Sequence, residues 1–288
     1  MELQFDSVCK SYRKKQALNN FTLTMHEGVY ALLGPNGAGK STLMNCLTDM
    51  QRQTAGEIRF NGQDIRTMGA SYRRILGYLP QNFGLYPQFT ARQILTYFAA
   101  LKEADHSAAA ISSRLETVNL TADADRKVGG YSGGMLRRLG IAVALLNDPA
   151  VLILDEPTAG LDPKERIRFR NLISAVSANR IVIFATHIVS DVEAIAREVI
   201  LLRAGEVLCH APLENLLKTM DGRVWLSEQP SADDALNRAL RISNLCKLAQ
   251  GVQLRLVCDE QPFANAIQTA PSLDDVYLYY FDEAAEDD

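Results

Sequence analysis

A glycine-rich segment that ends in lysine and two hydroxyl residues carries the strongest chemical signal in the sequence. It fits the pattern G-x-x-x-x-G-K-[ST] and lies between a buried-strand pattern at 28–33 and a helical pattern at 42–47. Glycines let successive backbone N–H groups wrap a polyphosphate, and the start of the helix adds its positive dipole end. Lys40 supplies a positive charge, and Ser41 supplies a hydroxyl ligand for Mg²⁺. The segment consists of Gly34, Pro35, Asn36, Gly37, Ala38, Gly39, Lys40, Ser41 and Thr42.

Two adjacent acidic residues, Asp155 and Glu156, follow the apolar run 151–154. The carboxyl ends of parallel strands face the ligand crevice, so both side chains are expected beside the phosphates. Asp155 suits Mg²⁺ held through water, and Glu156 suits a general base that deprotonates the attacking water. An acidic pair after a strand is by itself more often a helix cap or a loop feature. The phosphate-binding pattern in the same chain favours the catalytic interpretation.

Four further signals are weaker. The segment Ser132-Gly133-Gly134 opens a strongly helical stretch and predicts a second anion-binding helix start, with a plain serine cap as the equal alternative. His187 follows the strand pattern 181–185, where a phosphate contact competes with an ordinary core or surface histidine. Gln81 and Tyr12 indicate no special role when each is taken alone.

Composition excludes several classes of protein. The chain has 288 residues and a net charge of −4, so it has no overall basic field of the kind that holds nucleic acid. The longest apolar runs, 141–146 and 150–154, are far shorter than the ~20 residues of a membrane-spanning helix. Residues 1–6 show no secretory signal, so we expect a cytoplasmic protein. Five cysteines without a C-x-x-C pair argue against a disulfide framework or a zinc cluster.

The spacing of apolar residues predicts an α/β fold with buried parallel strands. We expect helices throughout 85–147, with a capping box at Thr90, and a further helix from Pro163. After Met220 we expect a strand, a helix near Ser231, a strand at 252–258 and two short helices. The acidic residues from Asp282 predict a solvated tail. The remaining strands are expected at 2–8, 21–25, 28–33, 56–62 (which ends in an Asn-Gly turn), 75–79, 151–154 and 181–184, with a hairpin joining 199–202 to 207–209.

Taken in order, these motifs resemble those of the nucleotide-binding subunit of ATP-binding cassette (ABC) transporters over about residues 2–218. The resemblance implies a P-loop NTPase core with an antiparallel β-subdomain, formed by 1–84 and 148–218. It also implies a helical signature subdomain at 85–147. Residues 219–288 would form a small C-terminal α+β domain.

The resemblance also implies ATP and Mg²⁺ as cofactors and a role for each motif residue. The signature of one copy would close over the ATP held by the phosphate loop of the other, which gives two sites in each dimer. Ser132, Gly133 and Gly134 would form the signature, and Ser41, Gln81 and Asp155 would be the metal ligands. Glu156 would be the catalytic base, Gln81 would also sense Mg²⁺ and water, and His187 would be the switch histidine. Asp162 would contact the other copy in the dimer, and Tyr12 would stack on adenine.

The signature departs from the commonest family sequence, Leu-Ser-Gly-Gly-Gln. Tyr131 and Met135 replace its leucine and glutamine. We expect this difference to affect the rate of hydrolysis more than the binding of ATP. Met135 followed by Arg137-Arg138 looks like the exporter branch that pairs with drug, antibiotic or polysaccharide permeases. The segment 271–276 looks like the closing segment of a small domain found in many such ATPases.

We therefore expect an ATPase subunit, peripheral on the inner face of the cell membrane, that drives a separate transmembrane permease as a homodimer or paired cassette. One alternative is a soluble mechanical ATPase that acts on ribosomes or DNA. Such relatives generally carry two cassettes or a long coiled-coil insertion, and this sequence has one cassette and no heptad run. Another alternative is a regulatory module that binds ATP without hydrolysing it.

Overall fold

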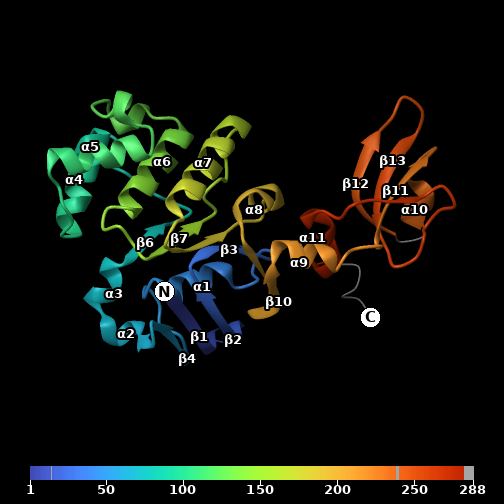
Figure 1. Ribbon diagram of the computed structural model, residues 1–288, viewed down its shortest axis with the longest axis horizontal. Coiled ribbons are helices and arrows are strands. Elements are labelled where there is room, and N and C mark those ends of the chain that lie inside the picture. The colour runs from blue at the N-terminus through green and yellow to red at the C-terminus, as the bar shows by residue number, and fades with distance from the viewer. Residues whose placement is uncertain (14, 238–239, 282–288) are drawn as a thin grey trace. The chain divides into compact units, whose positions relative to one another are not determined.

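The computed structural model describes residues 1–13, 15–237 and 240–281, and the chain divides into two compact units (Figure 1). These are Met1–His210 and Ala211–Asp288. The second unit begins earlier than the expected residue 219, because helix α9 (Leu213–Lys218) contacts α11 (Leu273–Phe281) within it. The acidic tail expected from Asp282 lies outside the described residues.

A six-stranded sheet forms the centre of the first unit. Its order is β10-β9-β3-β8-β7-β6, and the strands from β9 to β6 run parallel. All residues of β7 and β8 are buried, which explains why both strands are apolar apart from Asp155 at the end of β7. The predicted hairpin is confirmed, with a turn at Ala204 and Gly205, both at positive φ. The strands are β3 (Gly28–Leu33), β6 (Leu76–Leu79), β7 (Val151–Asp155), β8 (Ile181–Ala185), β9 (Glu198–Arg203) and β10 (Glu206–Pro212).

An antiparallel sheet of order β2-β1-β4-β5 packs in the same core as the six-stranded sheet. The rings of Phe5 and Phe21 meet edge to face, with their centroids 5.1 Å apart. The predicted strand 21–25 is only the second half of β2, because β2 stays paired with β1 through several register shifts as far as Tyr12 and Lys15. The strands are β1 (Glu2–Tyr12), β2 (Lys15–His26), β4 (Ala55–Phe60) and β5 (Gln63–Asp64).

Helices cover both faces of the six-stranded sheet. Figure 1 shows α1 between the two sheets, and α6 and α7 on the other side of the six-stranded sheet. Helix α1 begins at Lys40, two residues before the predicted start, and it buries Leu43, Met44 and Leu47 in the core. The helices are α1 (Lys40–Leu47), α2 (Ile65–Met68), α3 (Ala70–Arg74), α6 (Gly133–Ala144), α7 (Pro163–Val176) and α8 (Val189–Ile195).

The predicted helical block contains α4 (Ala91–Leu101) and α5 (Ala108–Thr117) followed by two short 3₁₀ turns and α6. The predicted capping box is confirmed, since Thr90 Oγ1 accepts a hydrogen bond from Gln93 N and the Gln93 side chain accepts one from Thr90 N. Among the residues that the structure describes, none of the helices has the length and apolar character that crossing a membrane requires.

The second unit is a four-stranded antiparallel sheet of order β12-β13-β11-β14 with short helices. The prediction missed β12, whose residues are largely exposed and show no clear alternation. It also expected two short helices after 258, and only α11 is found among the described residues. The core contains Trp225, Leu254 and Leu256. The elements not yet given are α10 (Asp233–Asn237), β11 (Val224–Gln229), β12 (Arg241–Lys247), β13 (Val252–Val257) and β14 (Ile267–Gln268).

One fully buried carboxylate, Asp275, holds several segments of the second unit together. Arg255 donates to it through Nε at 3.0 Å and Nη2 at 2.6 Å, and Ser243 Oγ donates at 2.5 Å. Ser272 donates through both its backbone N and its hydroxyl, each at 2.8 Å. Burial raises the pKa of Asp275, but these hydrogen bonds outweigh burial and leave its pKa below the usual value.

Replacement of Asp275 by Asn should lower the free energy of unfolding of this unit by about 3–5 kcal/mol, because the partly buried Arg255 guanidinium loses its fully buried counter-charge. Trp225 is the chain's single tryptophan, so its fluorescence during urea unfolding reports the unfolding of this unit.

The same contribution depends on pH. The Asp275 carboxylate stabilises the fold fully above the unfolded pKa of 3.8, and this stabilisation is lost as the pH falls through the lower folded pKa.

The control is Asp259→Asn, which removes an exposed carboxylate 3.0 Å from Arg223. Its effect should stay below about 1 kcal/mol, as is usual for surface ion pairs. Equal losses of stability in the two variants would contradict the structural role of Asp275.

Candidate functional site

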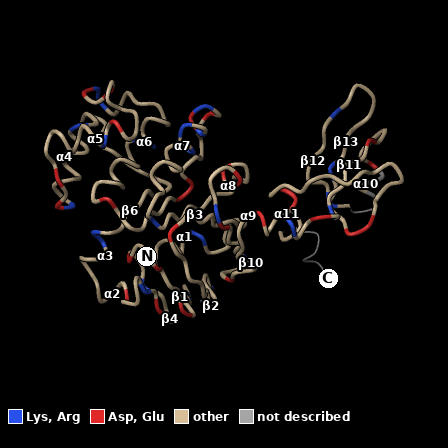
Figure 2. The backbone as a smooth tube through the Cα atoms, viewed as in Figure 1, with Lys and Arg blue, Asp and Glu red and all other residues tan. Residues whose placement is uncertain are grey.

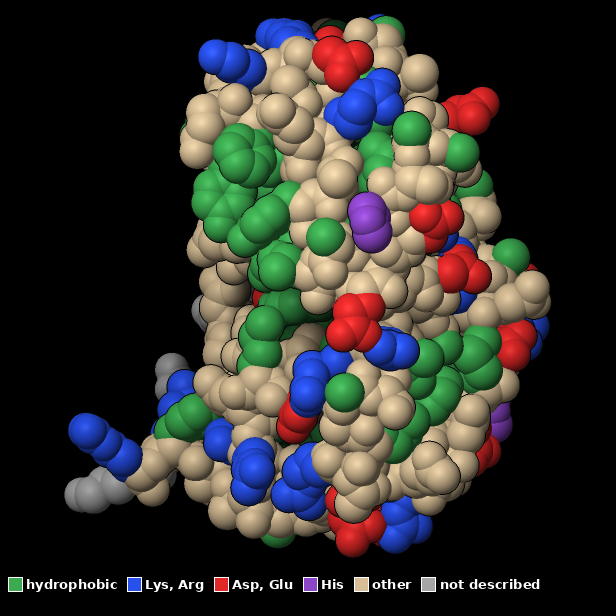
Figure 3. Space-filling view, turned by 90° about the vertical axis from the view of Figure 1, so that its left-hand side faces the viewer, with side chains coloured by type: hydrophobic (Ala, Val, Ile, Leu, Met, Phe, Trp, Pro, Cys, Tyr) green, Lys and Arg blue, Asp and Glu red, His purple; other side chains and the backbone are tan. Residues whose placement is uncertain are grey.

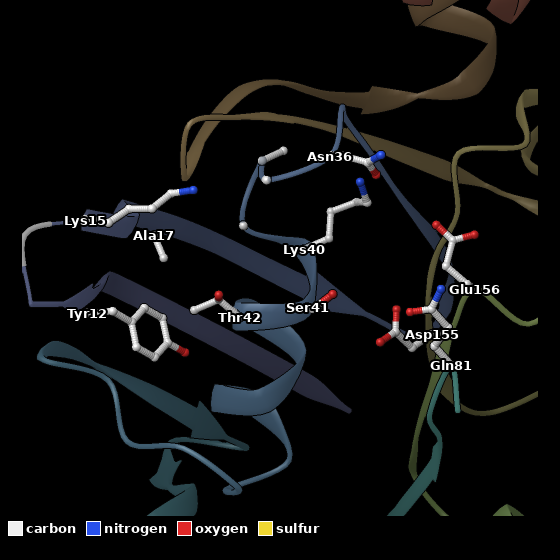
Figure 4. Close-up of a pocket in the computed structure, with 13 residues that line it drawn as sticks. Tyr12, Lys15, Ala17, Asn36, Lys40, Ser41, Thr42, Gln81, Asp155 and Glu156 are labelled. Carbon is white, nitrogen blue, oxygen red and sulfur yellow. The ribbon is translucent and has the colours of Figure 1, made fainter. Parts of the chain in front are cut away.

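The phosphate-loop pattern, the acidic pair, Gln81 and Tyr12 come together around one pocket of about 290 Å³ in the first unit. Strands β3, β6 and β7 end at this pocket, which brings the phosphate loop, Gln81 and the acidic pair together, and the adjoining ends of β1 and β2 supply the rest of its lining (Figure 4). The lining residues are Tyr12, Lys15, Ala17, Asn36, Gly37, Ala38, Gly39, Lys40, Ser41, Thr42, Gln81, Asp155 and Glu156.

Several expected site residues lie outside this lining. Gly34 and Pro35 begin the loop and present their carbonyl oxygens to Lys40. His187 is not part of the lining, but it contacts Glu156, which is. Gly133 lines a neighbouring cavity that also includes Gln81, and the structure does not bring Ser132, Gly134 or Asp162 into the first pocket of the same chain.

The start of α1 is built to accept a ligand. Gly39 precedes the helix at a φ of 109°, and a Cβ atom there would lie 2.5 Å from the carbonyl oxygen of Ala17. A side chain is therefore excluded at this position. No side-chain hydrogen bond caps the helix at Gly39, which leaves its first N–H groups facing the pocket for an anion.

Lys40 is buried at the floor of the loop. Its Nζ donates to the carbonyl oxygens of Gly34 at 2.6 Å and Pro35 at 3.1 Å. Burial lowers the pKa of Lys40, while the charges of Glu156 and Asp155 oppose this effect. A bound polyphosphate would raise the pKa of Lys40 again, because it would bring further negative charge close to this ammonium group.

Asp155 ends β7 and is buried next to the loop. Burial and the neighbouring charge of Glu156 raise the pKa of Asp155, and Lys40 and Arg137 oppose that rise. Its carboxylate, the Ser41 hydroxyl and the Gln81 amide face the same pocket. Oxygen donors of these types suit Mg²⁺, which prefers one or two protein ligands together with water and phosphate.

Glu156 is held in an uncommon backbone conformation. Its φ is 46°, a value that residues other than glycine rarely adopt, and its N–H donates to Ala185 O at 2.9 Å across to β8. Its carboxylate lies 3.0 Å from Nδ1 of His187 and 3.5 Å from the hydroxyl of Thr186. Strain of this kind gathers at functional sites, and here it fixes the direction of a carboxylate beside the pocket.

Tyr12 forms the far end of the pocket and is 40% exposed. The Nζ atom of Lys10 lies 5.1 Å from the centre of its ring, and its hydroxyl donates to Gln51. These contacts hold the ring in the lining of the pocket. Lys15 and Ala17 also line the pocket and were missed from the sequence, where the only signal was the basic run 13–15 directly after Tyr12.

The unusual signature residues have structural roles. Tyr131 is buried and its hydroxyl donates to Asp123 O at 2.7 Å, so its side chain belongs to the helical block. Ser132 Oγ accepts a hydrogen bond from Met135 N at 3.3 Å and caps α6. Ser132 therefore caps this helix, and Ser132 and Gly133 are both exposed, so the cap is compatible with either of the two roles expected for this segment.

Comparison with known proteins gives the family. Residues 18–159 match the family model described as ABC transporter. The ABC transporter ATP-binding protein YxlF of Bacillus subtilis (strain 168) is 34% identical over 96% of this chain and 98% of its own length. The chain belongs to the ABC transporter family. The Nod factor export ATP-binding protein I of Rhizobium meliloti (strain 1021) is also similar, at 32% identity over 94% of this chain and 85% of its own length.

Solved structures agree with this assignment. A structure of an ATP-binding subunit of an ABC transporter has a TM-score of 0.67 at 25% identity, covering 76% of this chain and 93% of that one. The dimeric post-hydrolysis state of the cassette MJ0796 bound to ADP and Pi has a TM-score of 0.65 at 27% identity, covering 73% of this chain and 98% of that one. The predicted fold class, with its P-loop NTPase core, and the prediction of an ATP-hydrolysing ABC subunit are confirmed.

Replacement of Lys40 by Ala should weaken ATP binding by this ABC subunit at least tenfold, because one buried cation close to several phosphate charges is lost. Isothermal titration calorimetry with MgATP measures the affinity. The control is Lys247→Ala, an exposed lysine on β12 of the second unit, which should leave the affinity unchanged. An unchanged affinity in the Lys40 variant would refute the assignment of the loop.

Proposed function

We propose that this ABC subunit hydrolyses MgATP between two copies of a cassette, on the inner face of the cell membrane, and so drives export through a separate transmembrane permease. The relatives support export, since their names include Nod factor export and probable multidrug transport. The observation that carries the catalytic proposal is the position of Glu156, whose strained backbone and contact with His187 hold its carboxylate at the phosphate pocket.

The groups that line the pocket lie in the same order as the parts of a nucleoside triphosphate. Tyr12 at one end offers an aromatic face to adenine, and the loop 34–42 offers backbone N–H groups to the phosphates. Lys40 now donates to two carbonyl oxygens of its own loop, and phosphate oxygens would replace them as acceptors. The acidic residues at the other end then face the terminal phosphate.

Hydrolysis needs one proton transfer from water. Glu156 accepts this proton while the water oxygen forms its bond to the terminal phosphorus, and the bond from that phosphorus to the bridging oxygen of ADP breaks. Glu156 then releases the proton to solvent, and ADP and phosphate leave. His187 positions Glu156 through the 3.0 Å contact, and the hydroxyl of Thr186 supports the same carboxylate.

Ser41, Asp155 and Gln81 are the residues that would hold Mg²⁺, directly or through water. The ion would neutralise phosphate charge as negative charge develops on the leaving oxygen. Asp155 has the matching chemistry, because the pKa of its buried carboxyl is raised and a nearby cation would favour its charged form.

A second copy is needed to complete the site. Ser132, Gly133 and Asp162 are exposed, and none of them lines the pocket of its own chain. In the proposed dimer, the start of α6 in each copy binds the terminal phosphate held by the other. Asp162 would meet the partner while its carboxylate keeps its bond from Glu165 N, which begins α7. ATP would join the copies, and hydrolysis would release them.

An apolar patch on the helical block suits the permease. It is defined as Tyr86, Phe89, Tyr97, Phe98 and Leu101, whose aromatic members have ring centroids 5.3–5.8 Å apart. Tyr86, Tyr97 and Leu101 are 45%, 40% and 62% exposed. Figure 3 shows hydrophobic side chains gathered on the face that carries α4. Such patches mark docking sites, and this one follows Gln81 closely in sequence, which would couple the permease to the pocket.

The mechanical ATPase of ribosomes or DNA fits less well. Figure 2 shows Lys and Arg interspersed with Asp and Glu along the described chain, and the net charge of −4 does not favour binding to nucleic acid. The relatives reported above are transport proteins.

Replacement of Glu156 by Gln should lower ATP turnover by about 10²- to 10⁴-fold, because the amide cannot accept the proton. Phosphate release by the purified chain with MgATP measures the rate, and calorimetry should show that ATP still binds. The control Glu116→Gln, on the exposed side of α5, should leave turnover unchanged. Turnover near that of the wild type would remove Glu156 from the catalytic role.

Replacement of Tyr97 by Ser should reduce co-purification of the polytopic permease at least tenfold, because it removes the ring at the centre of the apolar patch. As an exposed substitution it should change the free energy of unfolding by no more than about 0.5 kcal/mol. The control is Ile167→Ser on α7, an equally apolar side chain that is 50% exposed and lies outside the patch. Retention of the permease by the Tyr97 variant would refute this docking surface.

A further inference from the structure

The two glycines of the signature have different surroundings. A Cβ atom added to Gly133 would have no heavy atom within 4 Å. One added to Gly134 would lie 2.4 Å from Oε2 of Glu165 and 2.7 Å from its Cδ and Cγ. Glu165 therefore fills the space that a side chain at position 134 would need. Neither glycine has a positive φ, so a side chain at position 134 would conflict with Glu165 and not with the backbone conformation.

Glu165 is held firmly in that place. Its carboxylate lies 3.5 Å from Nε of Arg138 and accepts from Nη1 of Arg168 at 2.5 Å. The side chains of Glu165 and Arg138 are only 13% and 11% exposed. To make room for a methyl group at 134, the carboxylate would have to leave both arginines, and Arg138 would lose the charge that balances it in this buried position.

The same contact joins three helices near the signature. Glu165 is on α7, Arg138 is on α6, and Nη1 of Arg138 donates to the carbonyl oxygens of Val118 and Asn119 just after α5. The backbone N of Glu165 also donates to Asp162 Oδ1 at 2.9 Å. One residue thus contacts both segments that we assign to the partner's ATP, the signature through its side chain and Asp162 through its backbone.

We propose that Glu165 is a positioning residue that seats the signature turn against α7, and that Gly134 must be glycine because Glu165 occupies the space beside it. This rests on the proposed function, in which the signature acts on the partner's ATP. The two arginines have a second effect. They balance a carboxylate close to the start of α6, which would otherwise repel the phosphate that this helix start is to bind.

A double-mutant cycle tests this proposal through ATP turnover of the full chain with MgATP. Gly134→Ala alone should lower turnover about tenfold or more, and in the Glu165→Ala background the same change should cost at least fivefold less, within the range of coupling between residues in contact. Glu165→Gln keeps the size of the side chain, so it should not relieve the effect of Gly134→Ala. The matched control is Gly133→Ala, which should cost the same in both backgrounds because position 133 has no contact with Glu165.

A loss from Gly134→Ala that is equally large in the Glu165→Ala background would overturn the proposal, since the glycine would then be needed for a reason other than Glu165. Relief of Gly133→Ala by the same background change would also overturn it. Each variant chain should still bind MgATP in calorimetry, because Gly133, Gly134 and Glu165 all lie outside the pocket of their own chain, whereas a general loss of structure would abolish this binding. Absence of turnover by the wild-type chain and its permease would instead refute the proposed function itself.

Discussion

The shared edge at which the parallel strands end is the constraint on which the rest of the structure depends. Strands β3, β6 and β7 finish there, so the phosphate loop, Gln81 and the acidic pair lie around one pocket although they are far apart in the sequence. The burial of β7 and β8 on both faces fixes this alignment, because a shift of register would break pairing across the whole sheet. Helix α1 then directs its first N–H groups at the same place.

Opposed charges at this edge give the site its chemistry. Lys40 and Asp155 are both buried, and burial moves the pKa of each toward the neutral form. A bound triphosphate would bring negative charge to Lys40, and its cation would bring positive charge to Asp155. Each of the two groups would then be stabilised in its charged form. The backbone conformation of Glu156 and its contact with His187 fix the direction of its carboxylate. In the proposed dimer, the remaining phosphate contacts come from the signature of the other copy, so association and hydrolysis depend on each other.

Much of this could be predicted from the sequence, and the rest could not for physical reasons. The loop 34–42 and the pair Asp155 and Glu156 are local patterns, so their joint placement followed from a parallel sheet. The contact between Gly134 and Glu165 is made by two helices about thirty residues apart in the chain, and no periodicity encodes it. Strand β12 was missed because exposed strands lack alternation, and α9 was assigned to the wrong unit because its packing partner α11 comes much later.

The central claim is that ATP holds two copies together until it is cleaved. It is tested most directly by the mass of the slow variant Glu156→Gln, measured by multi-angle light scattering with and without MgATP. The account predicts 31.8 kDa without nucleotide and twice that mass with MgATP, and it predicts no increase when Ser132→Phe blocks the signature of the same variant. A chain that binds MgATP and keeps its single mass, in the presence of its permease as well, would contradict the account.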